Sequence, residues 1–226
     1  MNNQAIYIVI PAKDEAPRIG GVLSRIEVLG FQNVIIVNDG SSDDTAAIAS
    51  SFKNATILNH RLNLGAGAAT QTGIKYALKK GAEIIVTLDA DHQHQPEDIY
   101  ALIDTLKKEN LDVVIGSRFL RPSNEIPFLR ILYNKIGNFI SYLFTGLMVS
   151  DSQSGMKAFH ARFASQFELK SSGFEFCVEI IQHIRMAKAK WGEIPIKVTY
   201  TKETQEKGQN LKSGIMMMFR MVRTFW

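Results

Sequence analysis

The chain has 226 residues, a length that fits one domain with a sizeable core. Hydrophobic residues make up 46% of it and charged residues 21%, a balance that excludes an intrinsically disordered chain. The formal net charge of +4 favours anionic partners in general, such as nucleotides or lipid phosphates, and chooses none of them. The single cysteine, Cys177, excludes an internal disulfide and a cysteine-rich zinc site.

The sequence also bears on where the protein resides. No run of 18 apolar residues is present, so we expect no single helix that spans a bilayer. The first residues, Met-Asn-Asn-Gln, lack the basic start and long apolar core of a signal peptide. We therefore expect a cytoplasmic protein. No linker rich in Gly, Pro or Ser divides the chain, so we expect one domain over residues 1–226.

The first half alternates short apolar runs with helical patterns. We expect strands at Ala5–Ile10, Val34–Asn38, Ala55–Leu58, Glu83–Asp89 and Asp112–Gly116. Between them we expect helices at Glu15–Val28, Asp43–Phe52, Gly65–Lys80 and Pro96–Glu109. Continuous apolar strands separated by helices are typical of an α/β fold, a mostly parallel sheet with helices on both faces. Ligands of such sheets bind at the carboxyl ends of the strands.

The second half contains an amphipathic helical pattern over residues 126–149. Its apolar residues recur at helical spacing at Leu129, Leu132, Tyr133, Ile136, Ile140, Leu143, Phe144 and Leu147. Polar residues fall on the opposite side, at Arg130, Asn134, Asn138, Ser141 and Thr145. The apolar side either lies at a membrane interface or packs on the sheet or a second subunit. We expect a late strand at Ile194–Tyr200 and a mixed apolar segment at Ile215–Trp226.

The strongest chemical signal is Asp89-Ala90-Asp91-His92-Gln93, after the fourth expected strand. Residues two apart on an extended segment point the same way, so both carboxylates face one spot. Two such charges about 4 Å apart repel by roughly 4 kcal/mol at an effective dielectric of 20. A Mg²⁺ or Mn²⁺ ion relieves that repulsion and suits Asp and Gln oxygens. The alternative is an exposed turn whose carboxylates cap the next helix; His92 and His94 are not needed for a hard cation.

Other polar residues follow the remaining strands. Asp39, at the exit of the second strand, can accept hydrogen bonds from a base or ribose. Gly65 and Gly67 indicate a close approach of the backbone to a ligand or a neighbouring strand. Arg118 follows the fifth strand at the same edge of the sheet, and its guanidinium can bind a phosphate. Glu175 and Glu179 share one helix face and are expected to be solvated or capping carboxylates.

Taken together, these motifs resemble glycosyltransferase family 2, and more closely its polyprenyl-phosphate (dolichyl-phosphate mannosyltransferase-like) branch. The order and spacing of the matching segments fit over about residues 5–212. The matching segments are Ile10 to Glu15, Asn38 to Thr45, Asn63 to Gly67, Asp89 to Gln93, Gly116 to Arg118, Asp151 to Gly155 and Gly173 to Phe176. Two features depart from the family pattern. Lys13 and Asp14 replace a usually neutral pair, and the region Lys202–Lys212 is less densely basic.

The resemblance implies a GT-A fold, a Rossmann-like nucleotide-diphospho-sugar transferase domain, and an inverting transfer from GDP-mannose or a UDP-sugar. About residues 1–125 would bind the nucleotide sugar and about 126–226 the acceptor. By position, the donor residues are Pro11, Ala12, Asp14, Glu15, Asp39, Gly67, Asp89, Ala90, Asp91 and Gln93. Asp89, Asp91 and Gln93 would hold Mg²⁺ or Mn²⁺, and Arg118, Arg130 and Lys207 would bind an acceptor phosphate.

Two acceptors stay open. A polyprenyl phosphate is already charged at neutral pH and needs no base, so Asp91 and Arg118 would carry the catalysis. A glycan hydroxyl needs a general base, for which Asp151 is the candidate. With a lipid acceptor the protein would sit peripherally at the cytoplasmic face of a membrane. We expect no nucleic-acid partner; the donor and the oligomeric state stay open.

Three other classes of protein share parts of this pattern. A sugar nucleotidyltransferase would open with a glycine-rich, arginine-bearing loop, where this chain has Pro11 to Glu15. A phosphatase with an aspartate nucleophile carries its D-x-D on the first strand, not the fourth. A non-catalytic module that binds a nucleotide sugar or a lipid stays open, and it would bind the donor without turnover.

Overall fold

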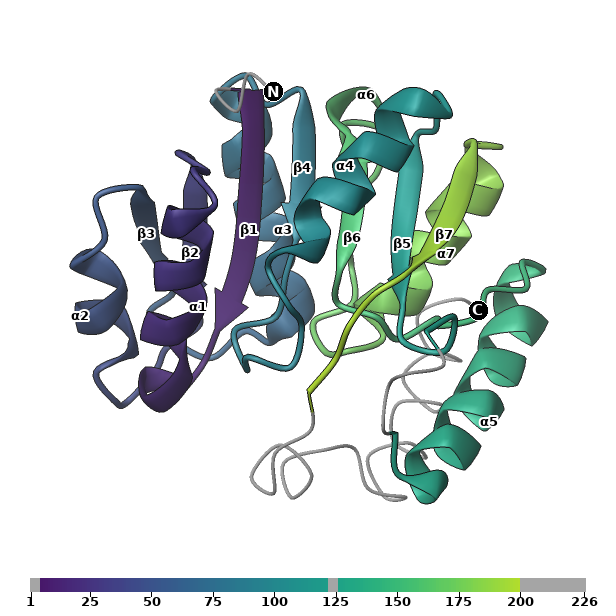
Figure 1. The fold of residues 1–226 in the computed structure, drawn as a ribbon, viewed down its shortest axis with the longest axis horizontal. Helices are drawn as coiled ribbons and strands as arrows, with labels where there is room; N and C mark the ends of the chain where they lie inside the picture. The colour runs from purple at the N-terminus through teal and green to yellow at the C-terminus, as the bar shows by residue number, and fades with distance from the viewer. Residues whose placement is uncertain (1–4, 122–125, 200–226) are drawn as a thin grey trace.

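In a computed structural model, which describes residues 5–121 and 126–199, the chain forms an α/β fold around a seven-stranded sheet (Figure 1). The strands are β1 (Ile6–Ala12), β2 (Val34–Asn38), β3 (Ala55–Asn59), β4 (Ile84–Thr87), β5 (Val113–Ser117), β6 (Lys157–His160) and β7 (Trp191–Pro195). The helices are α1 (Ala16–Val28), α2 (Thr45–Ser50), α3 (Ala66–Lys79), α4 (Asp98–Lys108), α5 (Phe128–Thr145), α6 (Ala161–Ala164) and α7 (Phe176–Met186).

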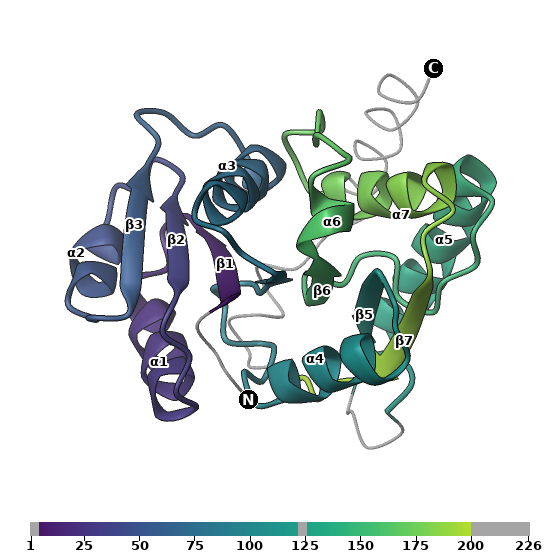
Figure 2. The same ribbon diagram turned by 90° about the horizontal axis from the view of Figure 1, so that it is seen from above.

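Helices cover both faces of the sheet, as Figure 2 shows from above. Successive strand residues point to opposite faces, so each apolar strand fills two cores. In β1, Ile8 and Ile10 pack with α1 and α4, while Val9 packs with α3 and α7 on the other face. The continuous apolar runs in the sequence follow from this double burial.

The strand order is β3-β2-β1-β4-β6-β5-β7. The chain moves outward from β1 to β2 and β3, and then returns to place β4 on the other side of β1. Loops that follow β1 and β4 therefore leave the sheet in opposite directions and open a crevice between them, where ligands of such sheets bind. The β1–β4 junction is thus the expected binding edge.

The expected elements of the first half are confirmed within one or two residues at most boundaries. β4 is shorter than expected, because Leu88 and Asp89 lie beyond its last paired residue, Thr87. The late strand is displaced: it runs over Trp191–Pro195, and Val198 forms only an isolated bridge with His94. The expected segment Ile215–Trp226 lies outside the described residues.

β6 was not expected from the sequence. It runs antiparallel between β4 and β5, and it brings the second half of the chain into the middle of the sheet. Strands from both expected halves therefore share one sheet.

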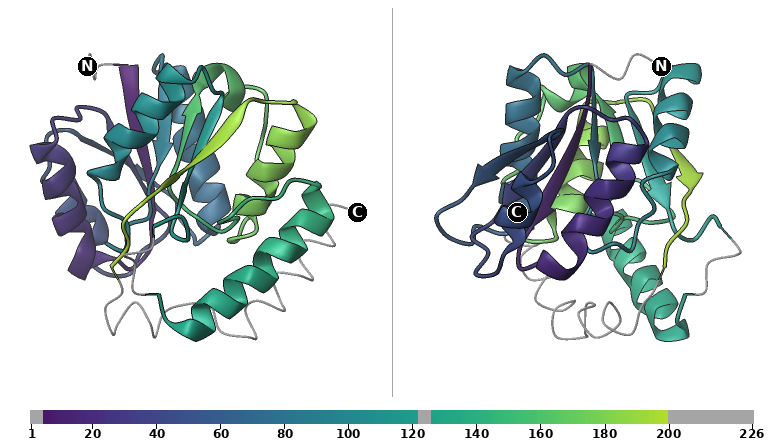
Figure 3. Two further views of the ribbon diagram at one scale, coloured as in Figure 1. Left: turned by 45° about the vertical axis from the view of Figure 1, so that its right-hand side comes forward. Right: turned by 60° about the vertical axis from the view of Figure 1, so that its left-hand side comes forward.

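Helix α5 runs along the edge of the molecule, on the side of α7 and β7 (Figures 1 and 3). The polar side chains of Asn134, Ser141 and Thr145 are buried, whereas many apolar ones are exposed. The exposed apolar side chains of α5 are Leu132, Tyr133, Ile136, Phe139, Tyr142 and Leu143. Packing of the apolar side on the sheet, one of the two alternatives, is therefore wrong for these residues.

We expect Gly73→Ala to destabilise the fold by about 1–3 kcal/mol, although alanine is the better helix former. A Cβ at Gly73 would lie 2.3 Å from Val9 Cγ1, so α3 would have to move off the sheet. Gly20→Ala is the matched control, since its Cβ would meet Ile48 Cγ2 at an ordinary 3.4 Å. Urea unfolding measures both; equal stabilities would contradict the close packing of α3 on β1.

Candidate active site

The acidic residues expected at the carboxyl edge do gather there. Asp89 and Asp91 follow β4, and Glu15 follows β1 on the other side of the β1–β4 junction. The negative charge of Glu15 raises the pKa of both aspartates, which places the three carboxylates in one electrostatic environment. The site therefore lies where the strand order reverses.

Asp89 is enclosed by residues that come from far along the chain. Its carboxylate lies against Gly155, where a Cβ would come within 2.1 Å of Asp89 Oδ2. Burial raises the pKa of Asp89, and the positive charges of Lys157 and Arg118 oppose that rise. The side chain keeps 35% exposure, so it is still reachable from solvent.

Asp91 is half-buried, and its Oδ1 accepts a hydrogen bond of 2.9 Å from the backbone N–H of Gln93. Burial raises the pKa of Asp91, and the negative charge of Asp89 raises it further. Ala90, between the two acids, is buried. Both carboxyl groups thus have a raised pKa. A divalent cation bound beside them would stabilise their charged forms.

The two histidines beside the acids have different surroundings. His92, which has a positive φ of 65°, places its Nε2 3.2 Å from Arg25 Nη1 on α1. His94 is buried, and its Nδ1 lies 3.4 Å from Asp89 Oδ2 without the geometry of a hydrogen bond. Neither ring nitrogen of His94 has a hydrogen-bond partner among the described residues.

These side chains fit a hard divalent cation. The carboxylates of Asp89 and Asp91 supply oxygen ligands at the edge of the sheet, and the unpartnered nitrogens of His94 lie beside them. Within residues 5–121 and 126–199, no group of three His, Cys, Asp or Glu side chains is gathered tightly enough to hold a metal ion alone. A cation there would complete its ligand shell with other oxygens, such as those of a diphosphate.

The loop after β1 is tied to the loop after β2. Asp14 has a positive φ of 52°, and its carboxylate accepts hydrogen bonds from the Ser42 N–H and from Lys13 Nζ. These bonds, the Ser42 N–H first, lower the pKa of Asp14 to about 2. The charged pair Lys13 and Asp14 therefore bridges two loops. Pro11 and Ala12 form the carboxyl end of β1, and Glu15 pairs with Arg18 at 2.6 Å.

Asp39 holds the loop that leads into α3. Its Oδ1 accepts hydrogen bonds from His60 Nδ1 (2.7 Å) and the Leu64 N–H (2.9 Å), and its Oδ2 accepts one from the Gly65 N–H (2.7 Å). A carboxylate has about four acceptor positions, so one remains on Oδ2. The expected contact of Asp39 with a base or ribose would have to use that position.

Gly67 has a packing role in the structure. Its N–H donates to Ser172 O at 2.8 Å, and a Cβ would lie 2.0 Å from Ser171 O. Gly65 approaches Ser172 in the same way. Because the N–H of Gly67 is already bonded, a contact of Gly67 with the nucleotide sugar would have to use its other backbone atoms, and that contact stays a prediction.

Arg118 and Asp151 form a buried ion pair. The Nε of Arg118 donates to Asp151 Oδ2 at 2.7 Å, Nη2 donates to Oδ1 at 2.6 Å, and the Arg118 backbone N–H donates to Oδ2 at 3.0 Å. Asp151 is fully buried, so the expectation that it serves as a general base is not supported by its position. A base must reach the proton that it removes, and both oxygens of Asp151 face Arg118.

The segment that carries Asp151 is held by α5. Asn138 donates from Nδ2 to Ser150 O at 2.6 Å, and its Oδ1 accepts from the Ser152 N–H at 2.9 Å. A Cβ at Gly137 would lie 2.4 Å from Gln153 Nε2, so the helix approaches this segment closely. The buried polar side of α5 therefore positions the Arg118–Asp151 pair.

The remaining predicted residues lie elsewhere. Arg130 stands in the first turn of α5. Lys207 lies outside the described residues. Glu175 precedes α7, and Glu179 is buried, where it accepts the N–H groups of Lys170 and Ser171 at 2.8 Å each. Both glutamates are buried and neither caps α7 with its side chain, so the expectation of solvated or capping carboxylates is wrong. Glu179 instead holds the loop at residues 170–171.

Lys157 was missed from the sequence. It is fully buried in β6, and its Nζ donates to Ser154 O. Among the nearby positive charges, it has the largest effect on Asp89. The available signal was a lysine inside the apolar run Met156 to Phe159, because a charged residue in a buried strand needs a partner.

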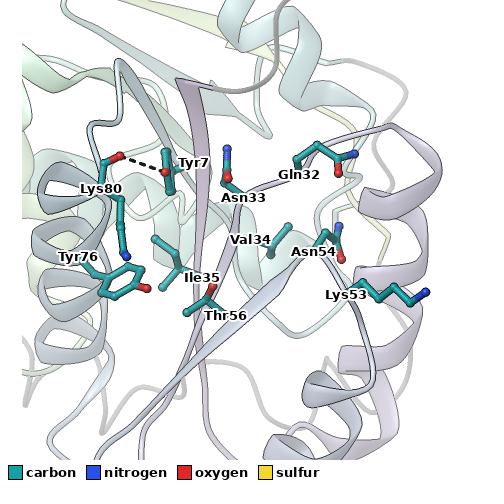
Figure 4. A pocket seen from close by; sticks show the side chains of 10 residues that line it. All are labelled: Tyr7, Gln32, Asn33, Val34, Ile35, Lys53, Asn54, Thr56, Tyr76 and Lys80. Carbon is teal, nitrogen blue, oxygen red and sulfur yellow. Dashed lines mark hydrogen bonds between the residues drawn. The ribbon is translucent and has the colours of Figure 1, made fainter.

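A cavity of about 230 Å³ lies at the opposite edge of the sheet (Figure 4). Its lining includes Tyr7, Asn33 and Thr56, which lie in or next to β1, β2 and β3. It also includes Tyr76 in α3 and Lys80 directly after that helix. The acidic residues are not among its lining residues, so this cavity is separate from the candidate site.

Comparisons with known proteins agree with this placement. A family model described as Glycosyl transferase family 2 matches residues 7–167. An uncharacterised protein of Methanocaldococcus jannaschii is 37% identical, over 98% of this chain and 93% of its own. The UDP-N-acetylglucosamine–dolichyl-phosphate N-acetylglucosaminyltransferase of Methanococcus voltae is 33% identical, over 98% and 96% of the two chains.

Solved structures share the fold. Glucosyl-3-phosphoglycerate synthase from Mycobacterium tuberculosis, in complex with Mn²⁺, uridine diphosphate and glucosyl-3-phosphoglycerate, superposes with a TM-score of 0.70. The match covers 96% of this chain and 77% of that one, at 16% sequence identity. Identity at this level shows a common fold, and nothing about the substrate follows from it.

We expect Asp151→Asn to lower the free energy of unfolding by about 3 kcal/mol, because it leaves the buried Arg118 guanidinium without its counter-charge. Asp104→Asn is the control, since Asp104 pairs with Lys108 at the surface and such pairs contribute little. Chemical denaturation measures both. Full stability of the Asp151 variant together with lost turnover would restore Asp151 as a general base.

Proposed function

Since the chain belongs to glycosyltransferase family 2 and has the GT-A fold of that family, we propose that it transfers a sugar from a nucleotide-diphosphate donor to a polyprenyl phosphate at a membrane surface. The observation that carries this proposal is the pair Asp89 and Asp91, held at the β1–β4 junction with Lys157 and Arg118 close by. Relatives support the acceptor class: one is a dolichyl-phosphate N-acetylglucosaminyltransferase, and another, 25% identical, is a polyprenol monophosphomannose synthase of Mycolicibacterium smegmatis.

The donor would lie across the carboxyl ends of β1, β2 and β4. Its nucleoside would contact the loops around Pro11, Ala12, Asp14 and Glu15, together with Asp39. Its diphosphate would face Asp89, Asp91 and Gln93, which would hold Mg²⁺ or Mn²⁺. The cation stabilises the negative charge that develops on the diphosphate as it leaves. The proposed transfer inverts the anomeric centre, because one acceptor oxygen displaces the diphosphate in line.

A phosphate acceptor agrees better with the site than a hydroxyl acceptor does. A lipid phosphate is already ionised, so the protein has to position and stabilise it, without removing a proton. Arg118 and Arg130 are the proposed phosphate ligands, and Arg118 would be shared with Asp151. The proposed base, Asp151, has both oxygens bonded to Arg118, which disfavours a glycan hydroxyl.

The exposed side of α5 supports contact with a membrane. None of the helices within the described residues is long and apolar enough to cross a bilayer. The side chains of Phe139 and Leu143, one turn apart, are 61% and 65% exposed on α5. An amphipathic helix with an apolar outer side binds at the boundary between headgroups and acyl chains. Because α5 also holds the segment of Asp151, a docked α5 would bring the lipid phosphate near Arg118.

We expect Asp91→Asn to reduce kcat at least 100-fold, because the leaving diphosphate loses its cation. Calorimetry with a panel of GDP- and UDP-sugars, with and without Mn²⁺, should then show donor binding that no longer depends on the cation. Glu83→Gln, an exposed residue just before β4, at the amino end of the strand, is the control and should keep full activity. Undiminished transfer by the Asp91 variant would refute the site.

We expect the double change Phe139→Asp and Leu143→Asp to reduce binding to vesicles that contain anionic phospholipid at least tenfold. The charges face outward, so circular dichroism and thermal stability should stay unchanged. Val28→Asp combined with Met186→Asp is the matched control, because these residues are 88% and 71% exposed on other helices. Co-sedimentation measures binding. A wild-type protein that stays in the supernatant would exclude membrane contact through α5.

A further inference from the structure

His94 is a buried side chain whose polar atoms have no partner. Its exposure is 5%, and neither Nδ1 nor Nε2 makes a hydrogen bond. A buried polar group without a partner costs about 1–3 kcal/mol, so such groups are rare and need an explanation. The unmatched nitrogens of His94 indicate a partner that the described residues do not supply.

The ring lies beside the acidic pair. The positive φ of His92 turns the chain after Asp91, and an isolated bridge with Val198 fixes the backbone of His94. His94 Nδ1 is 3.4 Å from Asp89 Oδ2. Two ligands at adjacent corners of an octahedron with bonds of about 2.1 Å are about 3 Å apart. The distance between His94 Nδ1 and Asp89 Oδ2 is therefore only slightly longer than the distance between two adjacent ligands of one cation.

An imidazole ring binds a metal ion through the lone pair of one ring nitrogen. The charges that act on the His94 ring include those of Asp91 and Asp151, so the ring lies in the same acidic surroundings as Asp89.

We propose that His94 is a ligand, through a ring nitrogen, of the cation that the proposed function places at Asp89 and Asp91, and that it makes this site prefer Mn²⁺ to Mg²⁺. The proposal rests on that function. Imidazole binds transition-metal ions well, whereas Mg²⁺ strongly prefers oxygen ligands. The shell closes when cation and diphosphate enter together, because the described residues hold no ready group of three such side chains.

His92 provides the matched control. It is two residues from His94, but its Nε2 lies 3.2 Å from Arg25 Nη1, and its ring packs close to Gly21 on α1. Comparing variants of the two residues therefore distinguishes a histidine that only shapes the turn from one that binds the cation. His94→Gln and His92→Gln remove one imidazole each and keep an amide of similar length.

The experiment is pulsed electron paramagnetic resonance of Mn²⁺ bound to the full chain with uridine or guanosine diphosphate. We expect a hyperfine coupling between Mn²⁺ and nitrogen in the wild type and its loss in His94→Gln alone. When the protein is labelled with ¹⁵N-histidine, the coupling should change to that of ¹⁵N. Titration should show Mn²⁺ affinity reduced at least tenfold in His94→Gln and Mg²⁺ affinity changed less than threefold. His92→Gln should match the wild type.

The outcomes separate this inference from the proposed function. Mn²⁺ bound with diphosphate but without histidine nitrogen coupling would overturn the role of His94 and leave the cation site of Asp89 and Asp91 standing. Absence of Mn²⁺ binding with either diphosphate would overturn the cation site itself. The labelled wild type decides on histidine coordination even if His94→Gln fails to fold, and coupling that persists in a folded His94→Gln also overturns the proposal.

Discussion

The repulsion between Asp89 and Asp91 is the constraint around which the rest of the site is arranged. Two unit charges about 4 Å apart repel by roughly 4 kcal/mol at an effective dielectric of 20, and partial burial increases the cost of ionising both. The positive charges of Lys157 and Arg118 offset part of this cost at Asp89, and the Gln93 N–H offsets part of it at Asp91. Arg118 is already paired with Asp151. Negative charge therefore remains at the solvent side of the pair, where a cation and a diphosphate can enter.

A continuous set of hydrogen bonds joins this site to α5. Asn138 binds both ends of the segment Ser150–Ser152, which carries Asp151, and Asp151 fixes the guanidinium of Arg118. Glu193, in β7, accepts the Ser150 N–H and so holds the same segment from the other side. The helix with the exposed apolar side and the arginine proposed to bind a phosphate thus share one support. Their relative position follows from the fold, not from a mobile linker.

The sequence was sufficient to predict which acidic residues gather at the carboxyl ends of the strands. It was insufficient to predict the residues that enclose them. Alternating apolar runs and helices require a parallel sheet, and parallel strands bring the residues after β1 and β4 to one edge. That argument places Glu15, Asp89 and Asp91. It does not reach Gly155 or Lys157, because they arrive through the antiparallel β6, whose four residues carry no periodic signal. The bonds of Asp39, Gly67 and Asp151 to distant backbone groups were equally invisible in the sequence.

The orientation of α5 shows a further limit of sequence patterns. Helical periodicity separates an apolar side from a polar side, but it does not state which side meets the protein. Here the polar side is buried because Asn138 satisfies backbone groups of residues 150–152. Burial of a large apolar side chain is worth about 1.5–3 kcal/mol, so the six exposed ones on α5 represent a substantial driving force for association. Monomeric proteins rarely leave such a patch uncovered. In the proposed function, a lipid surface would cover this patch and bring a lipid phosphate to the side of the sheet where the acids gather.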